Sequence, residues 1–66
     1  MLTPREIEVV RLLARGCRYA EIGKALGVAP NTVTTHIKNA YRKLKVHCAA
    51  AAVMRAVELR LLGVKP

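Results

Sequence analysis

The sequence predicts an all-α fold, a compact four-helix bundle that contains a helix-turn-helix, and three observations lead to it. Apolar residues recur at helical spacing in four segments, and no strand-like alternation persists. Gly16, Gly27 and Gly63 each follow one of these apolar stretches, at the position where helices commonly end. The apolar side chains are mostly Ala, Leu and Val, which suit closely packed helices. At this length we expect a single domain over residues 1–66.

The first helix is expected to begin at Thr3 and Pro4. Thr3 can accept a hydrogen bond from the free N–H groups of the first turn, and Glu6 can reach back to complete a capping box. Pro4 suits the first helical position because its missing N–H would have no partner there. Gly16 ends the helix. The apolar side chains predicted to face the core are Ile7, Val10, Leu13 and Ala14.

A short second helix is expected over residues 20–26, and Gly27 closes it. Gly23 places almost no side chain on this helix, which would allow another helix to cross it closely. A third helix begins at Pro30, only a few residues further on. Two helices joined by a tight glycine-containing turn form the helix-turn-helix pattern, which would run over about residues 20–39.

The third helix, over about residues 30–45, separates into two faces when its residues are placed about 100° apart. One narrow face is apolar and is expected to anchor the helix: Val33, Ile37, Ala40 and Leu44, with Tyr41 at its edge. The other face is polar and cationic and contains no acidic residue: Asn31, Thr34, Thr35, Lys38, Arg42 and Lys45. An ordinary solvated helix would explain any single cation of this set. Two adjacent threonines, which are poor helix formers, have no structural reason to stand in mid-helix.

The first half of this polar face carries residue types that read DNA bases. Lysine can donate to guanine O6 or N7, and threonine offers a hydroxyl group and a methyl group that can contact thymine. Because the N-terminal part of a recognition helix reaches base edges, we expect Thr34, Thr35 and Lys38 to contact bases. Arg42 and Lys45 lie further along the helix and are better placed to contact phosphates.

The charge balance favours an anionic partner. Twelve Lys and Arg against four Glu give a net charge of +8, and residues 34–66 carry most of it. Nucleic acid is the commonest partner of so basic a domain, and an anionic membrane surface is the weaker alternative. The longest apolar run, residues 48–54, is far too short to cross a bilayer. Charged residues interrupt the N-terminal segment, so we also expect no signal peptide.

The sequence offers little for covalent or metal chemistry. Cys17 and Cys48 are too few for a disulfide framework and lack the clustered spacing of a zinc site. The chain has no Asp and no Ser, so hydrolytic constellations are scarcely available. We therefore expect no enzyme activity, no metal, no cofactor and no small-molecule ligand in this domain, and a reducing, cytoplasmic location. His36 lies between the two faces of the third helix, where a structural or phosphate-contacting role fits better than catalysis.

A fourth helix is expected over residues 49–62, ended by Gly63, and it is apolar almost all round. One arc holds Val53 together with the residues predicted to form a dimer interface: Ala50, Met54, Val57 and Leu61. A second arc holds Ala49, Ala52, Ala56 and Leu59. One helix of a four-helix domain cannot bury both sides internally, so the second apolar side indicates a partner. A central core helix with alanines at its rim is the alternative. Two-fold pairing would predict a palindromic DNA site with half-sites about one helical turn apart.

An ordered set of short motifs resembles a known family of DNA-binding domains. The segments that carry the resemblance are Leu2–Glu6, Gly16, Glu21–Ile22, Leu26–Val28, Thr32–Val33, His36 and Lys43–Leu44. Over about residues 2–63 they are similar to the LuxR/FixJ-type (NarL-like) helix-turn-helix domain. The resemblance implies the four-helix DNA-binding domain of a bacterial transcription regulator, which dimerises through its fourth helix and places residues 30–45 in the major groove. The implied base contacts are at Thr34, Thr35 and Lys38, and the implied phosphate contacts lie near Asn31, Thr32 and Arg42.

Departures from the family pattern affect the predicted contacts. Thr34 stands where family members often carry a basic residue, so the base preference cannot be transferred. The usual residues at the start of the second helix are replaced, and Arg18 or Tyr19 can supply the phosphate contact instead. Ala29 and the run Ala49–Ala51 remove side-chain caps from the third and fourth helices.

The resulting hypothesis is sequence-specific binding of double-stranded DNA by a bacterial transcription regulator, or by the C-terminal effector domain of one. It would act as a homodimer on DNA, in the cytoplasm and on the nucleoid. Two alternatives remain open. A protein-interaction module would keep the fold and work through the fourth helix. A sigma-factor region-four domain shares the segments Glu21–Gly23 and Gly27–Val28, although Thr34–His36 fits the LuxR-type pattern better.

Overall fold

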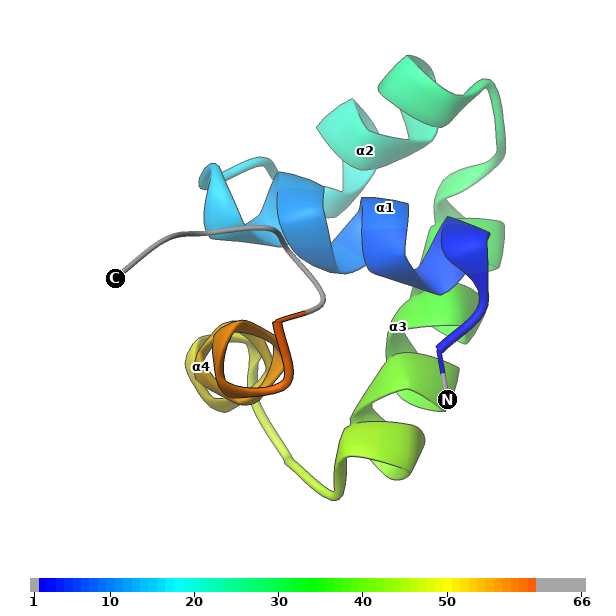
Figure 1. Cartoon of the computed structure of the whole chain (residues 1–66). Helices are drawn as coiled ribbons and strands as arrows, with labels where there is room; N and C mark the ends of the chain where they lie inside the picture. The colour runs from blue at the N-terminus through cyan, green and yellow to red at the C-terminus, as the bar shows by residue number, and fades with distance from the viewer. Residues whose placement is uncertain (1, 61–66) are drawn as a thin grey trace.

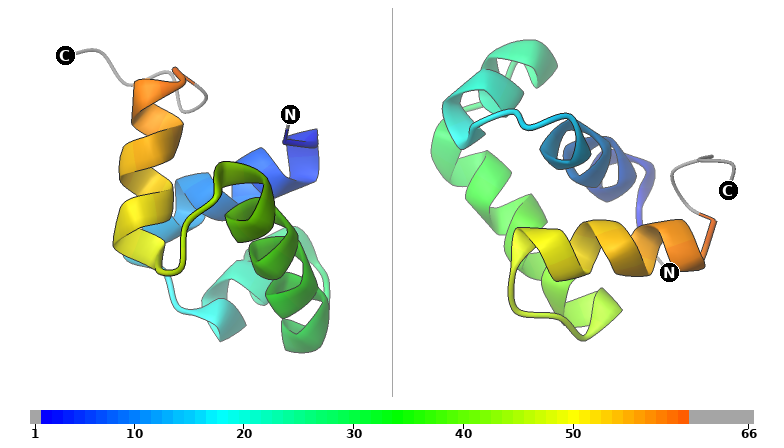
Figure 2. Two further views of the ribbon diagram at one scale, coloured as in Figure 1. Left: turned by 90° about the horizontal axis from the view of Figure 1, so that it is seen from below. Right: turned by 90° about the vertical axis from the view of Figure 1, so that its left-hand side faces the viewer.

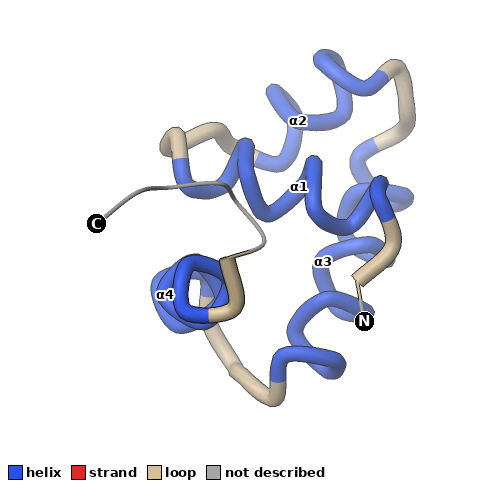
Figure 3. Tube along the Cα trace, in the orientation of Figure 1, coloured by secondary structure: helices blue, strands red, loops and turns tan. Residues whose placement is uncertain are grey.

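The computed structural model describes residues 2–60, and within that range the chain forms four helices and no strand (Figures 1 and 3). The helices are α1 (Pro4–Ala14), α2 (Tyr19–Leu26), α3 (Pro30–Leu44) and α4 (Ala49–Glu58). The predicted all-α class is confirmed, and so are the beginnings of the four helices to within one residue. In the described range no helix combines the length and the apolar character that a bilayer crossing requires.

The arrangement leaves one long side of α3 free of other helices. α1 lies between α2 and α4, and α3 runs along the side of the molecule and contacts all three (Figures 1 and 2). Within residues 2–60, α2 and α4 do not contact each other. The helix-turn-helix formed by α2 and α3 is therefore supported from one side by α1, and the opposite side of α3 faces outward.

The predicted capping box at the start of α1 is confirmed. The Glu6 backbone N–H donates to Thr3 Oγ1 over 3.1 Å, and the Thr3 N–H donates to Glu6 Oε1 over 2.9 Å. Lys43 Nζ of α3 donates to the same carboxylate oxygen over 2.9 Å, so this pair also joins α1 to α3. Burial alone would raise the pKa of Glu6, but the hydrogen bonds from Lys43 and Thr3 and the Lys43 charge outweigh it and hold that pKa below its usual value.

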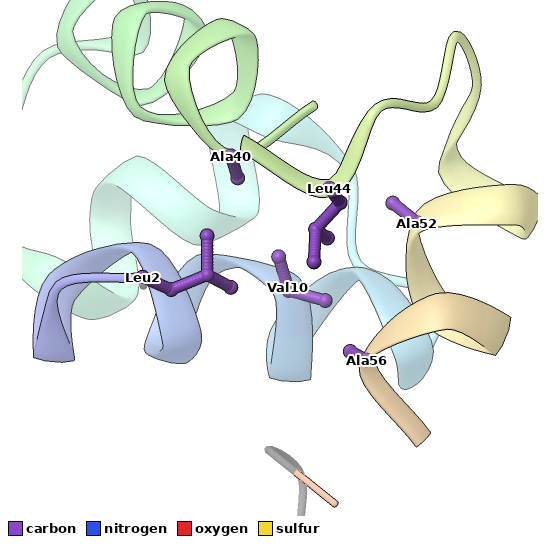
Figure 4. Close-up of a cluster of buried hydrophobic side chains, with 6 residues drawn as sticks. All are labelled: Leu2, Val10, Ala40, Leu44, Ala52 and Ala56. Carbon is purple, nitrogen blue, oxygen red and sulfur yellow. The ribbon is translucent and has the colours of Figure 1, made fainter. Parts of the chain in front are cut away.

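The core consists of two clusters on either side of α1. The first joins α1, α3 and α4 and contains Leu2, Val10, Ala40, Leu44, Ala52 and Ala56 (Figure 4). The second joins α1, α2 and α3 and contains Val9, Ile22, Val33 and Ile37. The apolar face predicted for the third helix is confirmed, because all four of its residues are buried and are divided between the two clusters.

The predicted core face of the first helix was partly wrong. Val9, which was not assigned to that face, is fully buried, whereas Ala14 is exposed. Because α1 lies between α2 and α4, its buried arc is centred on the adjacent pair Val9 and Val10, and each of the two residues enters a different cluster. Ala14 is the last residue of α1, where the chain turns away toward α2.

Gly23 is needed at a close approach, which involves the third helix as predicted and also the turn before it. A Cβ atom on Gly23 would lie 3.4 Å from Val33 Cγ2 of α3 and only 2.7 Å from the Val28 carbonyl oxygen, so the turn backbone makes the tighter contact. The Val28 N–H donates to the Gly23 carbonyl over 2.9 Å, and Gly27 adopts φ of 71°, so the turn folds tightly back onto α2.

We expect Gly23→Ala to lower the free energy of unfolding by about 1–3 kcal/mol, because the turn backbone cannot move without shifting α3. The measurement is urea denaturation followed by far-UV circular dichroism. Lys24→Ala, at the next and exposed position of α2, is the control and should change the free energy by less than about 0.5 kcal/mol. Equal stability of the two variants would contradict this account of the turn.

The fourth helix is shorter than predicted. α4 ends at Glu58 with Leu59 as its C-cap, and Arg60 adopts φ of 59°. Residues 61–62 and the predicted terminator Gly63 lie outside the described residues. Ala52 and Ala56 are the buried residues of α4, so its alanine side faces the core.

Candidate nucleic-acid interface

The polar face predicted for the third helix lies on the outward side of α3. Val33 and Ile37 fix the orientation of the helix because both side chains are buried against α1 and α2. Thr34 is half-buried at the edge of the outward side. The other predicted residues of this face, together with Thr32, are exposed: Asn31, Thr32, Thr35, Lys38, Arg42 and Lys45.

The hydroxyl groups of Thr34 and Thr35 donate to the backbone of their own helix. Thr34 Oγ1 donates to the Pro30 carbonyl and Thr35 Oγ1 to the Asn31 carbonyl, both over 3.1 Å. The hydroxyl proton is thereby occupied, and the oxygen keeps the capacity to accept a hydrogen bond from a partner. On a base edge such an oxygen would accept from the amino group of cytosine or adenine, and the methyl group would contact thymine.

Cations on the outward side of α3 have no acidic partner in the described part of the chain. Among residues 2–60 the ion pairs are Lys43–Glu6 at 2.9 Å and Arg55–Glu58 at 3.5 Å. Neither pair includes Lys38, Arg42 or Lys45. The outward side therefore presents positive charge that is not neutralised within the domain, and this is the electrostatic feature that attracts a polyanion.

The start of α2 adds two further exposed side chains. The Arg18 N–H donates to Glu21 Oε1 over 2.7 Å, which satisfies the N-terminal backbone of α2, and the Arg18 side chain is exposed. Tyr19 is 41% exposed and lies beside Tyr41 of α3. Burial and the neighbouring Tyr19 phenol raise the pKa of Tyr41 above its usual value. The start of α2 and the C-terminal half of α3 thus meet at these tyrosines.

The expected loss of helix caps is confirmed. The N-caps of α3 and α4 are Ala29 and Cys48, and neither supplies a side-chain hydrogen bond. His36 is half-buried on α3.

On α4 the predicted dimer residues differ in accessibility. Met54 is 65% exposed and Ala50 is exposed, whereas Val57 is half-buried and packs on the first core cluster. Leu61 lies outside the described residues. The exposed apolar surface of α4 is therefore centred on Met54.

The fold and the outward face of α3 define a helix-turn-helix domain. The GerE family model, which describes bacterial regulatory proteins of the luxR family, matches residues 1–56. This chain therefore belongs to the luxR family. The resemblance inferred from the short motifs is confirmed.

Individual relatives agree with this assignment. The transcriptional activator protein CarR of Pectobacterium carotovorum subsp. carotovorum is 43% identical over 61 residues, which cover 92% of this chain and 25% of CarR. The probable transcriptional regulatory protein NarL of Mycobacterium tuberculosis (strain ATCC 25618 / H37Rv) is 45% identical over 62 residues, which cover 94% of this chain and 29% of that protein. The chain thus spans less than a third of the length of these curated relatives.

The solved structure of the transcription factor GerE has the same fold. It superposes with a TM-score of 0.86 and 33% sequence identity, covering 91% of this chain and 90% of the GerE chain.

Proposed function

We propose that this domain binds double-stranded DNA sequence-specifically and regulates transcription, with α3 in the major groove. The observation that carries the proposal is the outward side of α3, where threonines and cations without acidic partners stand on a helix anchored by Val33 and Ile37. Membership of a family of bacterial regulatory proteins and the net charge of +8 support it.

Base contacts are assigned to Thr34, Thr35 and Lys38. They occupy the N-terminal and middle turns of α3, the part of a recognition helix that reaches base edges. Lys38 is one turn from both threonines, so the three side chains can contact neighbouring base pairs in one groove. Lysine donates to guanine, and the threonine oxygens, whose protons are occupied within the helix, accept from amino groups of bases.

Phosphate contacts are assigned to the exposed residues that flank these positions: Asn31, Thr32, Arg42 and Lys45 on α3, and Arg18 and Tyr19 at the start of α2. No side chain caps the start of α3. Pro30 has no N–H and the Thr32 N–H donates to the Ala29 carbonyl, so the Asn31 N–H is the first-turn donor that a phosphate oxygen can use. The two helices would then hold the DNA backbone on either side of the base contacts.

The test of this proposal is selection of bound sequences from a random duplex library by the purified domain. We expect a recurring motif of a few base pairs, recovered at physiological salt. Recovery of sequences without any shared motif would leave only non-specific polyanion binding and would contradict the proposal.

We assign dimerisation of two copies of this domain on DNA to α4, through Ala50, Met54, Val57 and Leu61. The exposed apolar surface around Met54 supports this assignment, because a small domain rarely leaves such a side chain exposed near the middle of an apolar helix without a partner. In a two-fold interface each Met54 would lie near its counterpart, and the two recognition helices would reach half-sites about one helical turn apart.

We expect Met54→Arg to weaken cooperative binding to a duplex with two half-sites by about 2 kcal/mol, because the substitution would bring two like charges together at the interface. The measurement is a titration of duplexes with one and with two half-sites. The fold should be unaffected, since Met54 is 65% exposed.

Leu59→Arg is the matched control for this substitution. Leu59 is 49% exposed at the C-terminal end of α4, outside the assigned set, and its substitution should leave cooperativity unchanged. An equal loss of cooperativity with Met54→Arg and Leu59→Arg would contradict the assignment of the dimer interface. Tight binding of another protein through Met54, without cooperativity on DNA, would favour an interaction module instead.

A further inference from the structure

An open groove lies between α1 and the C-terminal end of α2. Two cations, one carboxylate and three apolar side chains line it: Arg11, Arg15, Glu8, Leu12, Ala25 and Leu26. Its volume is about 320 Å³, at the low end for small-molecule sites, and it is open to solvent, so it suits side chains of a polymer better than an enclosed small ligand. None of the six residues takes part in the contacts proposed with DNA or in the proposed dimer interface.

The groove lies on the side of α1 that faces away from the recognition helix. Val10 packs in the first core cluster with residues of α3, and at the helical period it lies nearly opposite Glu8 and Leu12. The DNA contacts proposed on α2 are Arg18 and Tyr19 at the start of that helix, about 10 Å along its axis from the end that borders the groove. A duplex on the outward side of α3 therefore leaves the groove accessible.

The floor of the groove is apolar. Leu12 and Leu26 are half-buried and pack on the second core cluster, so the core holds their exposed parts in place. Ala25 is exposed and adds no polar group. The phosphates of a duplex would gain nothing from such a floor, whereas an aliphatic side chain would bury apolar area on it. The floor therefore favours a protein segment over nucleic acid.

Arg11 and Arg15 give the groove a cationic rim. They lie one turn apart on α1, both are exposed, and neither takes part in the two ion pairs found among residues 2–60. Guanidinium groups at this spacing match carboxylates one turn apart on a partner segment, and each pair can be bidentate. Glu8 lies two turns from Arg15 and would repel a carboxylate, so the acidic end of a partner belongs beside Arg15. The charge pattern thus favours an acidic segment and sets its direction.

A second copy of this chain does not supply such a segment. The chain has four glutamates and no aspartate. Three of the glutamates are engaged within the domain: Glu6, Glu21 and Glu58. The fourth, Glu8, belongs to the groove itself. No two of the four are three or four residues apart in the sequence, so a second copy offers no pair of carboxylates one helical turn apart. The occupant is therefore a different protein.

We propose that the groove between α1 and α2 binds an acidic segment of another protein. An aliphatic side chain of that segment lies on Leu12 and Leu26. Two carboxylates one turn apart pair with Arg11 and Arg15. This interaction goes beyond the proposed DNA binding, because the domain can hold the partner while α3 occupies its duplex.

The first test is selection from a random library of displayed peptides of about twelve residues. Peptides that also bind the domain carrying both Arg11→Glu and Arg15→Glu are removed, because they bind elsewhere, including the cationic side of α3. We expect the remaining peptides to share an aliphatic residue and two carboxylates three or four positions apart. If the remaining peptides share no pattern, or a pattern without acidic residues, the proposal is wrong.

The second test measures the two halves of the proposed contact by fluorescence anisotropy with one selected peptide. Arg15→Glu should weaken binding by about tenfold, because it replaces an attraction by a repulsion. Arg5→Glu makes the same charge change on an exposed residue of α1 outside the groove and should weaken binding by less than about twofold. Far-UV circular dichroism checks that both variants keep the fold.

Replacement of the aliphatic residue of the peptide by serine tests the apolar floor without altering the domain. It leaves all charges unchanged and should weaken binding by about tenfold. Equal losses with Arg15→Glu and Arg5→Glu, or an unchanged affinity of the serine peptide, would mean that net charge alone attracts the peptide. Either result would overturn the proposal.

A titration in the presence of DNA separates this inference from the proposed function. Saturating amounts of the selected duplex should change the peptide affinity by less than about threefold, because the groove faces away from α3. Displacement of the peptide by the duplex would place the peptide on α3 and overturn the inference, while the proposed function would stand. The peptide selection does not use α3, so its result holds even if the domain shows no DNA sequence preference and the proposed function fails.

Discussion

Lys38→Ala is expected to weaken binding to the selected DNA motif by about 1–3 kcal/mol and to relax the preference at one base pair. Lys38 is exposed on the outward side of α3 and forms no ion pair within residues 2–60, so its ammonium group is free to donate to a base. The loss should be larger for the selected motif than for a random duplex, because a base contact is made only at the correct site. Fluorescence anisotropy on both duplexes measures the difference.

Arg42→Ala is the matched control for Lys38→Ala. Arg42 lies one turn further along the same exposed side of α3, and its assigned partner is a phosphate. Its removal should weaken the two duplexes alike and lower the salt slope by about one. Lys38 also lines an open groove together with Arg42 and Lys45. A uniform loss with Lys38→Ala would therefore reassign Lys38 to the phosphate backbone. Base reading would then be left to the two threonines.

Local sequence signals predicted the parts of the structure that depend on one helix at a time. The capping box at Thr3 and Glu6 was predictable because its partners are three residues apart. The buried face of α3 was predictable because the spacing of Val33 and Ile37 repeats at the helical period. Family membership followed from short motifs in a fixed order.

Features that join two helices were not predictable in this way. The ion pair of Glu6 with Lys43 joins residues 37 apart in the sequence, and no local pattern relates them. The buried position of Val9 follows from the placement of α1 between α2 and α4, which a single helical pattern does not contain. The contact between Tyr19 and Tyr41 likewise depends on how α2 and α3 pack.

The candidate site likewise combines features that one helix determines with features that depend on how two elements pack. Exposure of Lys38 and Arg42 could be inferred from the α3 pattern. The open groove that both residues line together with Val46 and His47 could not, because it also requires the conformation of the connection to α4. Lys45 illustrates the point: a helix end in the left-handed region is usually recognised by its glycine, and here the residue is a lysine.

Leu44→Ala is expected to lower the free energy of unfolding by about 2–5 kcal/mol. The Leu44 side chain is buried and extends from α3 toward Val10 of α1, with Ala52 and Ala56 of α4 nearby (Figure 4). Because α4 contributes only small buried side chains to this cluster, little else can fill the space that the substitution opens. Domain stabilities are about 5–15 kcal/mol, so this loss would be a large fraction of the total.

Leu44→Met is the control, because it preserves the volume and should cost less than about 1.5 kcal/mol. Both variants are compared by urea denaturation. Equal midpoints would show that the packing of α1, α3 and α4 does not depend on the Leu44 side chain. Leu44 is also the last residue of α3, directly before Lys45, so loosening it should disturb the connection to α4. At temperatures where Leu44→Ala is still folded, its DNA binding should therefore show a lower salt slope, while its preference for the selected motif persists through Thr34, Thr35 and Lys38. A loss of that preference with an unchanged slope would contradict the division of α3 into a base-contacting half and a phosphate-contacting half.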